Sequence, residues 1–305
     1  MWLEVPPQRA RPEPRMRRLA SLRAHLVRGA PARDADGDAR RIEVLEAELA
    51  ILKQRQRAAA VGPTKPLQGI RVLEVANWLA APVAGAIMAD MGADVIKVEA
   101  PTGDTMRYGL RQPNDPGAKE RDHIRPSKHW VDVGFHQENR GKRSIAIDMA
   151  TVEGQEIVHK LAAKADVFIT NLLPERLDKY RANAATIRAL NPRLIYASVT
   201  GFGMEGEARN NPGFDLTAYQ AQGGVMGILG EAGAPPVKMR PGMGDHPTGL
   251  SCLAGILAAL QLRHTTGVGT TVETSLLRTA TFVMGCDMAC AINDGTCGQA
   301  APVAS

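Results

Sequence analysis

IRVLEVANWLAAPVAGAIMADMGADVIKVE, residues 70–99, is the stretch that decides the fold. Ile70–Val75 has the apolar content of a buried strand, and Ala93–Glu99 has the same character. Ala80–Met91, between them, is rich in small residues and long enough for a helix. A strand, a helix and a second strand form a βαβ unit, in which the two strands run parallel.

The same alternation continues along the chain. Strands are predicted over residues 144–148, 165–171 and 194–200, and helices over residues 152–163 and 184–190. Repeated units of this kind predict an α/β fold with a Rossmann-like, mostly parallel sheet and helices on both faces. Ligands of such folds bind beyond the carboxyl ends of the strands. The sequence contains neither the GxGxxG fingerprint of dinucleotide-binding proteins nor a Walker P-loop.

The charge is unevenly distributed. Residues 1–65 hold 14 Lys and Arg against 8 Asp and Glu, whereas the rest of the chain holds 23 against 24. The excess positive charge is therefore confined to the first segment and gives no support for nucleic-acid binding by the main domain. We expect a basic, largely disordered tail with a short helix at about residues 40–59, a domain at 66–291 and a disordered end at 292–305. A transit segment or an over-long translation start are alternative explanations of the tail.

The rest of the composition favours a cytoplasmic protein. No apolar run reaches 18 residues, so no membrane span is expected. The four cysteines all follow residue 250 and form no CxxC pair, which favours reduced thiols over a disulfide framework or a zinc site. The polar segment 100–138 carries His123, His129 and His136 at unrelated spacings, which is more typical of a surface loop than of a metal site.

A single aspartate stands among glycines in MRPGMGDHPTGLSCLAGILAALQLR, residues 239–263. The apolar residues from 250 to 262 predict a buried helix, and Pro247 suits its first turn, so Asp245 or His246 falls near the N-cap. An aspartate at a helix start is commonly only a cap. The glycines at 242, 244 and 249 favour a different role, because they let a ligand or another backbone approach the carboxylate closely and leave backbone N–H groups free for an oxyanion. Asp245 would then be a covalent nucleophile.

Five segments of the chain, in order, resemble one family. The segments are LQGIRVLEVANWLAAPVAGAIMADMGADVIKVEAPTGD (67–104), NRGKRSIAIDM (139–149), ADVFITN (165–171), NPRLIYASVTGFG (191–203) and GMGDHPTG (242–249). Together they resemble the class III CoA-transferases, which include formyl-CoA, carnitine and related acyl-CoA transferases and the α-methylacyl-CoA racemases. The resemblance covers about residues 66–290 and implies the N-terminal part of the large domain of such an enzyme.

The resemblance implies a reaction and its substrates. The family's nucleophilic aspartate falls on Asp245, which favours the catalytic role over the helix cap. It would attack an acyl-CoA thioester to form a mixed anhydride, become an aspartyl-CoA thioester, and pass CoA to a carboxylic acid. Coenzyme A is then a substrate, no cofactor is bound permanently and no metal is required. The implied partners are an acyl-CoA, a carboxylic acid acceptor and a second subunit of a homodimer.

Family positions that contact CoA carry over onto turns that follow the predicted strands. They are Leu79, Ala80, Ile147, Asp148, Met149, Ala150, Asn171, Leu172, Leu173, Gly213 and Phe214. Lys179 falls where the family often has a phosphate-binding arginine, and a solvated helix charge is the alternative. Asp215 is implied to orient the nucleophile or the substrate, and an N-cap for residues 216–221 is the alternative.

The sequence departs from the family at several points. Basic residues that some members use near the adenosine are replaced by Ala100 and Ala150. Racemases have a histidine directly before the aspartate at 215, where this chain has Phe214. Exchange of an α-proton needs two opposed acid–base groups, so transfer is favoured over racemisation, which remains an alternative. Members also continue well past the position of Ala291, so a truncated, non-catalytic CoA-binding relative is a further alternative, and low activity of this chain alone is expected.

Overall fold

The computed structural model describes residues 44–48, 50, 65–108, 133–230 and 233–295 of the 305-residue chain. Two compact units divide after residue 66. In the first, residues 44–48 and 50 are helical, while the rest of the helix predicted at 40–59 lies outside the described residues. The disorder predicted for residues 1–39 and from 296 onward also lies outside them. No helix in the described ranges has both the length and the apolar content that a bilayer crossing requires.

The second unit is built on six parallel strands in the order β3-β2-β1-β4-β5-β6. The strands are β1 (Arg71–Val75), β2 (Asp94–Glu99), β3 (Arg143–Ala146), β4 (Val167–Thr170), β5 (Ile195–Thr200) and β6 (Thr271–Ser275). From β1 at the centre, β2 and β3 are added toward one edge of the sheet. The chain then returns to the centre, and β4, β5 and β6 are added toward the other edge. The topological switch point therefore lies between β1 and β4, and the predicted α/β fold class is confirmed.

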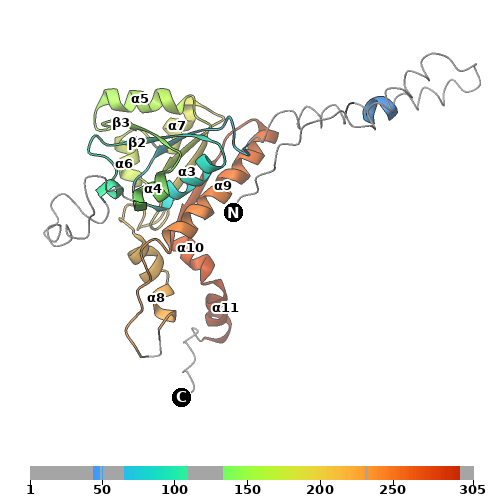
Figure 1. Cartoon of the computed structure of the whole chain (residues 1–305). Helices are drawn as coiled ribbons and strands as arrows, with labels where there is room; N and C mark the ends of the chain where they lie inside the picture. The colour runs from blue at the N-terminus through green and yellow to red at the C-terminus, as the bar shows by residue number, and fades with distance from the viewer. Residues whose placement is uncertain (1–43, 49, 51–64, 109–132, 231–232, 296–305) are drawn as a thin grey trace, which may run out of the picture. The chain divides into compact units, whose positions relative to one another are not determined.

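Helices cover both faces of the sheet (Figure 1). One face carries α3 (Ala80–Asp90) and α9 (Asp245–Thr266), and the other carries α5 (Val152–Ala162), α6 (Pro174–Lys179) and α7 (Ala184–Leu190). Successive strand residues point to opposite faces, so Val72 packs on the α3 side while Leu73 packs on the α5 side. These two apolar clusters fix the helices on the sheet and thereby position the turns at its carboxyl edge.

A second group of helices lies beyond the carboxyl edge of the sheet (Figure 1). It contains the π-helix η3 (Asp215–Ala221), α8 (Val225–Ile228), α10 (Leu276–Val283) and α11 (Gly285–Asp294). Tyr219, Leu276 and Ala280 belong to its separate apolar cluster. Because α11 continues to Asp294, the helical structure extends past the boundary that was predicted at residue 291.

Several predicted elements have different bounds in the structure. The helix expected at residues 250–262 is longer and begins at Asp245. The segment 100–138, expected to be a loop, contains the 3-10 helix η1 (Thr105–Tyr108) and the start of α4 (Val133–Asn139) within its described part. The strand expected at residues 144–148 is β3, which ends at Ala146, so residues 147–148 already belong to the turn before α5. Helix α6 and strand β6 were not predicted.

Candidate active site

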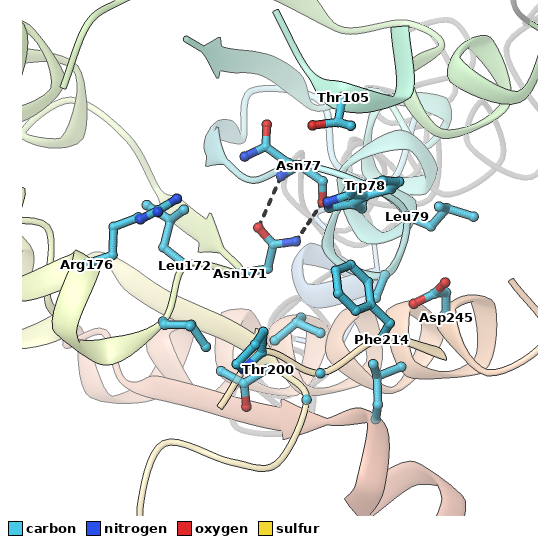
Figure 2. A pocket seen from close by; sticks show the side chains of 17 residues that line it. Asn77, Trp78, Leu79, Thr105, Asn171, Leu172, Arg176, Thr200, Phe214 and Asp245 are labelled. Atoms are coloured by element: carbon cyan, nitrogen blue, oxygen red, sulfur yellow. Dashed lines mark hydrogen bonds between the residues drawn. The ribbon is translucent and has the colours of Figure 1, made fainter. Parts of the chain in front are cut away.

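A cavity of about 390 Å³ opens at the carboxyl ends of β1, β4 and β5, beside the switch point of the sheet. Its walls come from the turns after β1 and β4, the end of β5, residues 212–214 and the start of α9. In Figure 2, Arg176 and Asp245 lie on opposite sides of the view, with Asn77, Trp78 and Asn171 between them. The cavity thus has a cation near one end and a carboxylate near the other.

The turn after β1 is held by side chains from two other segments. The backbone N–H of Asn77 donates to Oδ1 of Asn171 at 3.1 Å, and Nδ2 of Asn171 donates to the Asn77 carbonyl at 2.6 Å (Figure 2). Trp78 adopts a left-handed backbone with φ of 65°, and its N–H donates to Oδ1 of Asp104 at 3.2 Å. Its ring meets the ring of Phe214 edge to face, with 5.7 Å between centroids. The turn therefore presents a fixed aromatic wall to the cavity.

A buried ionic cluster anchors Asp104. Nζ of Lys97 lies 2.8 Å from Asp104 Oδ2 and 3.1 Å from Glu74 Oε1, and Nζ of Lys142 lies 2.8 Å from Glu74 Oε2. The four side chains are at most 2% exposed, so each charge depends on its partners for stabilisation. The cluster consequently fixes the carboxylate that holds the Trp78 backbone.

Asp245 is the first residue of α9. The N-cap residue is Gly244 and no side chain caps the helix, so the helix-cap alternative for Asp245 is wrong. Its carboxylate lies at the positive end of a 22-residue helix, which favours the ionised form. Leu79 and Phe214 line the same side of the cavity (Figure 2). The structure therefore brings the predicted nucleophile to a cavity at the ligand-binding edge of the sheet.

Asp215 holds the turn that precedes Asp245. Its Oδ2 accepts a hydrogen bond from the Gly242 N–H at 2.6 Å, and its Oδ1 accepts one from the Gly244 N–H at 3.0 Å. The N-cap of its own helix is Phe214, so the expected alternative of an N-cap at Asp215 is wrong. Both glycine N–H groups are occupied, so the prediction that they are free to stabilise an oxyanion is also wrong.

The glycines around Asp245 serve packing. A Cβ on Gly244 would lie 2.3 Å from Cγ of Tyr219, and a Cβ on Gly249 would lie 2.6 Å from the Ala80 carbonyl oxygen. Gly244 therefore lets the turn approach η3, and Gly249 lets α9 approach α3 closely. Gly242 has φ of 88°, a left-handed conformation that favours glycine. The prediction that another backbone approaches closely is confirmed at Gly249, whereas the close neighbours of Gly244 are the side chains of Tyr219 and Asp215.

The charges around Asp245 determine its protonation. Burial, together with the Asp215 carboxylate, raises the pKa of Asp245 to about 7, while the charge of His246 acts in the opposite direction. A hydrogen bond to Glu138 raises the pKa of His246 to about 9. Between these two values Asp245 is ionised beside a protonated imidazole. A carboxylate that is both ionised and incompletely solvated is suited to nucleophilic attack.

The predicted site residues separate into two groups. Those that line the cavity are Leu79, Ala80, Asn171, Leu172, Leu173, Gly213, Phe214 and Asp245. Those that do not line it are Ile147, Asp148, Met149, Ala150, Lys179 and Asp215. Residues 147–150 follow the edge strand β3, two positions from β1, and Oδ1 of Asp148 accepts the Ala150 N–H at 2.9 Å in the turn into α5. Lys179 is the exposed last residue of α6, whereas Arg176 of the same helix lines the cavity.

Several residues of the site were not predicted from the sequence. Trp78 and Asn77 stand in the quoted βαβ segment, next to two residues that were chosen. Arg176 lies three positions before Lys179, so a helical-face argument could have included it. Glu138 gave no signal, because its connection to His246 spans 108 residues of sequence.

Comparisons with known proteins identify the family. A model of CoA-transferase family III matches residues 67–303. The chain belongs to this family. It is 37% identical over 222 residues to the cinnamoyl-CoA:phenyllactate CoA-transferase of Clostridium sporogenes, a match that covers 73% of this chain and 52% of the relative. It is 40% identical over 221 residues to the succinate–glutarate CoA-transferase of Agrobacterium fabrum, which covers 72% and 53%.

A solved structure supports the assignment. The CaiB/BaiF family protein of Brucella suis matches with a TM-score of 0.69 at 36% identity, covering 78% of this chain and 60% of that one. The resemblance that the sequence motifs indicated is therefore confirmed. The chain of this CoA-transferase family III member spans about half the length of the curated relatives that it matches.

Proposed function

We propose that this chain carries the nucleophile and the CoA-binding surface of an enzyme that transfers CoA from an acyl-CoA to a carboxylic acid. One observation supports this most directly: Asp245 lines a cavity at the switch point of the sheet, at the N-terminus of a long helix. Membership of CoA-transferase family III supports the same reaction class. The relatives named as CoA-transferases act on different acids, so the comparisons favour no single donor or acceptor.

In the proposed mechanism an Asp245 oxygen attacks the thioester carbon. A carbon–oxygen bond forms, the carbon–sulfur bond breaks, and CoA leaves as a thiolate, which gives a mixed anhydride. The thiolate then attacks the Asp245 carboxyl carbon and releases the donor acid, which leaves an aspartyl-CoA thioester. The acceptor carboxylate attacks the carbonyl carbon of this thioester, the carbon–sulfur bond breaks, CoA leaves again as a thiolate, and a second anhydride forms. The thiolate finally attacks the acceptor carbonyl and regenerates the Asp245 carboxylate.

The start of α3 supplies the proposed oxyanion donors. Its N-cap residue is Leu79, which offers no side chain to the first N–H groups of the helix. Leu79 and Ala80 both line the cavity. We therefore propose that the N-terminus of α3 stabilises negative charge in the cavity, a role for which the occupied glycine N–H groups before α9 are not free.

The other end of the cavity suits the phosphates of CoA. Arg176 lines this end, and a guanidinium binds phosphate oxygens in bidentate fashion. Asn171, Leu172 and Leu173 lie on the turn that leads to it. We therefore assign the phosphate contact to Arg176 in preference to Lys179. Asp215 is proposed as a positioning residue that acts through the turn before Asp245.

The racemase alternative has weaker support. It requires an acid–base group opposite Asp245, and the position that racemases use for it holds Phe214, whose side chain cannot transfer a proton. Turnover with a 2-methylacyl-CoA in deuterated water tests this point. We expect an unlabelled α-position, and deuterium incorporation dependent on Asp245 would favour racemisation.

Trapping of the acyl-enzyme tests the proposed function. The chain is incubated with an acyl-CoA and hydroxylamine, which converts an aspartyl anhydride or thioester into a hydroxamate. Peptide mass spectrometry should locate the hydroxamate on Asp245 and should detect none in Asp245→Asn. Glu156→Gln, which changes an exposed carboxylate on α5, is the matched control and should react like the parent chain. A hydroxamate elsewhere, or none in the parent chain, would contradict the assignment.

A further inference from the structure

One ion pair reaches the site from α4, a helix that contributes nothing to the lining of the cavity. Nε2 of His246 lies 2.8 Å from Oε1 of Glu138, and Nδ1 of His246 lies 2.7 Å from the Gly242 carbonyl oxygen. The Glu138 side chain is 4% exposed and that of His246 is 38% exposed. His246 directly follows Asp245 at the start of α9. The imidazole therefore bridges α4 and the turn that carries the nucleophile.

The partners of the ring indicate its protonation state. A backbone carbonyl and a carboxylate both accept hydrogen bonds, so both ring nitrogens donate only in the imidazolium form. The hydrogen bond to Glu138 accordingly raises the pKa of His246 to about 9. Nε2 of the Gln137 amide lies 3.3 Å from Nε2 of His246, and exchange of the amide nitrogen and oxygen would place an acceptor there, as an imidazolium requires.

Gly242 is held from two directions. Its N–H donates to Asp215 of η3, and its carbonyl accepts from His246 of α9. A peptide segment fixed at both polar groups, in a left-handed conformation, sets where the chain enters α9. Asp245 lies three residues later, so its position depends on both contacts.

Without the imidazolium of His246, the ionisable groups that act on Asp245 would all be negative. The ionisable groups that act on Asp245 are Asp215 from η3, Glu138 from α4 and His246 from α9 itself. Two of these are carboxylates, which oppose ionisation of a third, and His246 supplies the positive charge.

We propose that Glu138 and His246 are positioning residues for Asp245: the pair fixes the turn before the nucleophile and keeps a positive charge beside its carboxylate. The catalytic consequence rests on the proposed function, whereas the structural and electrostatic consequences do not. The two roles of His246 can be tested separately. In His246→Asn the asparagine side chain can still donate a hydrogen bond to the Gly242 carbonyl, but it carries no charge.

Nuclear magnetic resonance titration tests the pair without any turnover. In a chain labelled with ¹³Cγ-aspartate, the Asp245 resonance, assigned from Asp245→Asn, is followed against pH in the parent chain and in His246→Asn. We expect the midpoint for Asp245 to rise by about 0.5–1 pH unit when the imidazolium is lost. The control is His264→Asn, which changes an exposed histidine in the last turn of the same helix and should leave the midpoint unchanged. An unchanged midpoint in His246→Asn would overturn the proposal.

Glu138→Gln provides the second measurement, because the glutamine has nearly the same volume as the buried glutamate. The imidazole of His246 should then lose its proton at a pH at least one unit lower than in the parent chain. A His246 titration that is unaffected by this change would overturn the pairing.

The pH dependence of hydroxylamine trapping provides the link to catalysis. In His246→Asn the rise of the trapping rate should occur at a higher pH, by the same amount as the Asp245 midpoint. The acyl-CoA concentration that gives half the maximal rate should change little. If the midpoints move as expected but no chain forms a hydroxamate, the proposed function fails and the positioning pair stands. If the trapping rate rises at the same pH in His246→Asn as in the parent chain, the catalytic role of the pair is overturned.

Discussion

Asp215 and Gly242 are joined by a 2.6 Å hydrogen bond from the glycine N–H to the carboxylate, across 27 residues of sequence. The same carboxylate also accepts the Gly244 N–H. A residue of η3 thereby fixes the turn from which α9 begins. The proposed catalytic role of Asp245 therefore depends on a buried carboxylate that does not itself line the cavity.

Asp215→Asn should loosen this turn. The amide retains one acceptor oxygen and places an NH₂ group opposite a backbone N–H, so one of the two hydrogen bonds is lost. We expect the free energy of unfolding to fall by about 1–2 kcal/mol, measured by urea denaturation. Hydroxylamine trapping should slow by about 100-fold, because the nucleophile is displaced. Trapping at the parent rate would show that the turn is fixed without Asp215.

The rate of trapping should depend on pH as a bell-shaped curve. Attack requires the carboxylate of Asp245, whose pKa is about 7, so the rate should rise as the pH increases through 7. It should fall as His246, with a pKa of about 9, loses its proton, because the neutral ring can donate to only one of Gly242 and Glu138 and the turn before Asp245 loosens. The expected optimum is near pH 8, after correction for the pH dependence of hydroxylamine itself. A rate that is already maximal at pH 5 would mean that Asp245 has the pKa of an ordinary exposed aspartate.

The fold could be predicted from the sequence where the patterns are local. Residues 184–190 are helical as expected, and the predicted strands at 165–171 and 194–200 contain β4 and β5. Strand β6 was missed because TVETS has a single apolar residue and completes its hydrogen bonds only against β5. Helix α6 was missed because PERLDK has only one residue, Leu177, that is buried.

The site was predictable only in part, and for a physical reason. Leu79 and Asn171 were implied by the resemblance and Asp245 by its glycine-rich surroundings and the resemblance, and all three line the cavity at the end of a strand or the start of a helix. The roles of the glycines were misjudged because a free N–H and one occupied by Asp215 look identical in a sequence. Residues 147–150 were placed in the site from the resemblance; they follow the edge strand β3 and do not line the cavity.

Gly244→Ala tests the packing of the turn. The added Cβ would lie 2.3 Å from Cγ of Tyr219 and 2.4 Å from Oδ1 of Asp215, so the turn must move away from η3. We expect a loss of about 1–3 kcal/mol in the free energy of unfolding and a large loss of trapping. Gly285→Ala is the matched control, because nothing lies within 4 Å of the added atom. Equal stability of the two variants would contradict the close approach.

Lys97→Met tests the ionic cluster behind Trp78. Removing this ammonium leaves the carboxylates of Glu74 and Asp104 without one of their cations in a buried place, which costs about 3–5 kcal/mol. The free energy of unfolding from urea titration measures the loss. Lys164→Met, at an exposed lysine, is the control and should change stability by less than about 0.5 kcal/mol. If Lys97→Met also changed stability by less than about 0.5 kcal/mol, the cluster would contribute little to stability.

Asp245→Asn should stabilise the protein while it abolishes trapping. The pKa of Asp245 is about 7 in the folded chain and near the ordinary aspartate value of 3.8 in the unfolded chain, so the folded state binds the proton more tightly. Stability conferred by that proton is present below pH 4 and is lost as the pH rises toward 7. At pH 8 the ionised aspartate therefore destabilises the parent chain, and asparagine removes this cost.

The expected gain in Asp245→Asn is at most about 4 kcal/mol at pH 8, from a shift of about three pKa units at 1.36 kcal/mol each. At pH 4 the difference between the two chains should be close to zero, because the aspartate is then neutral in the folded state. Urea denaturation of both chains at the two pH values measures the effect. Equal stability at pH 8 would contradict the raised pKa, and would leave Asp245 with the solvation of an ordinary surface carboxylate.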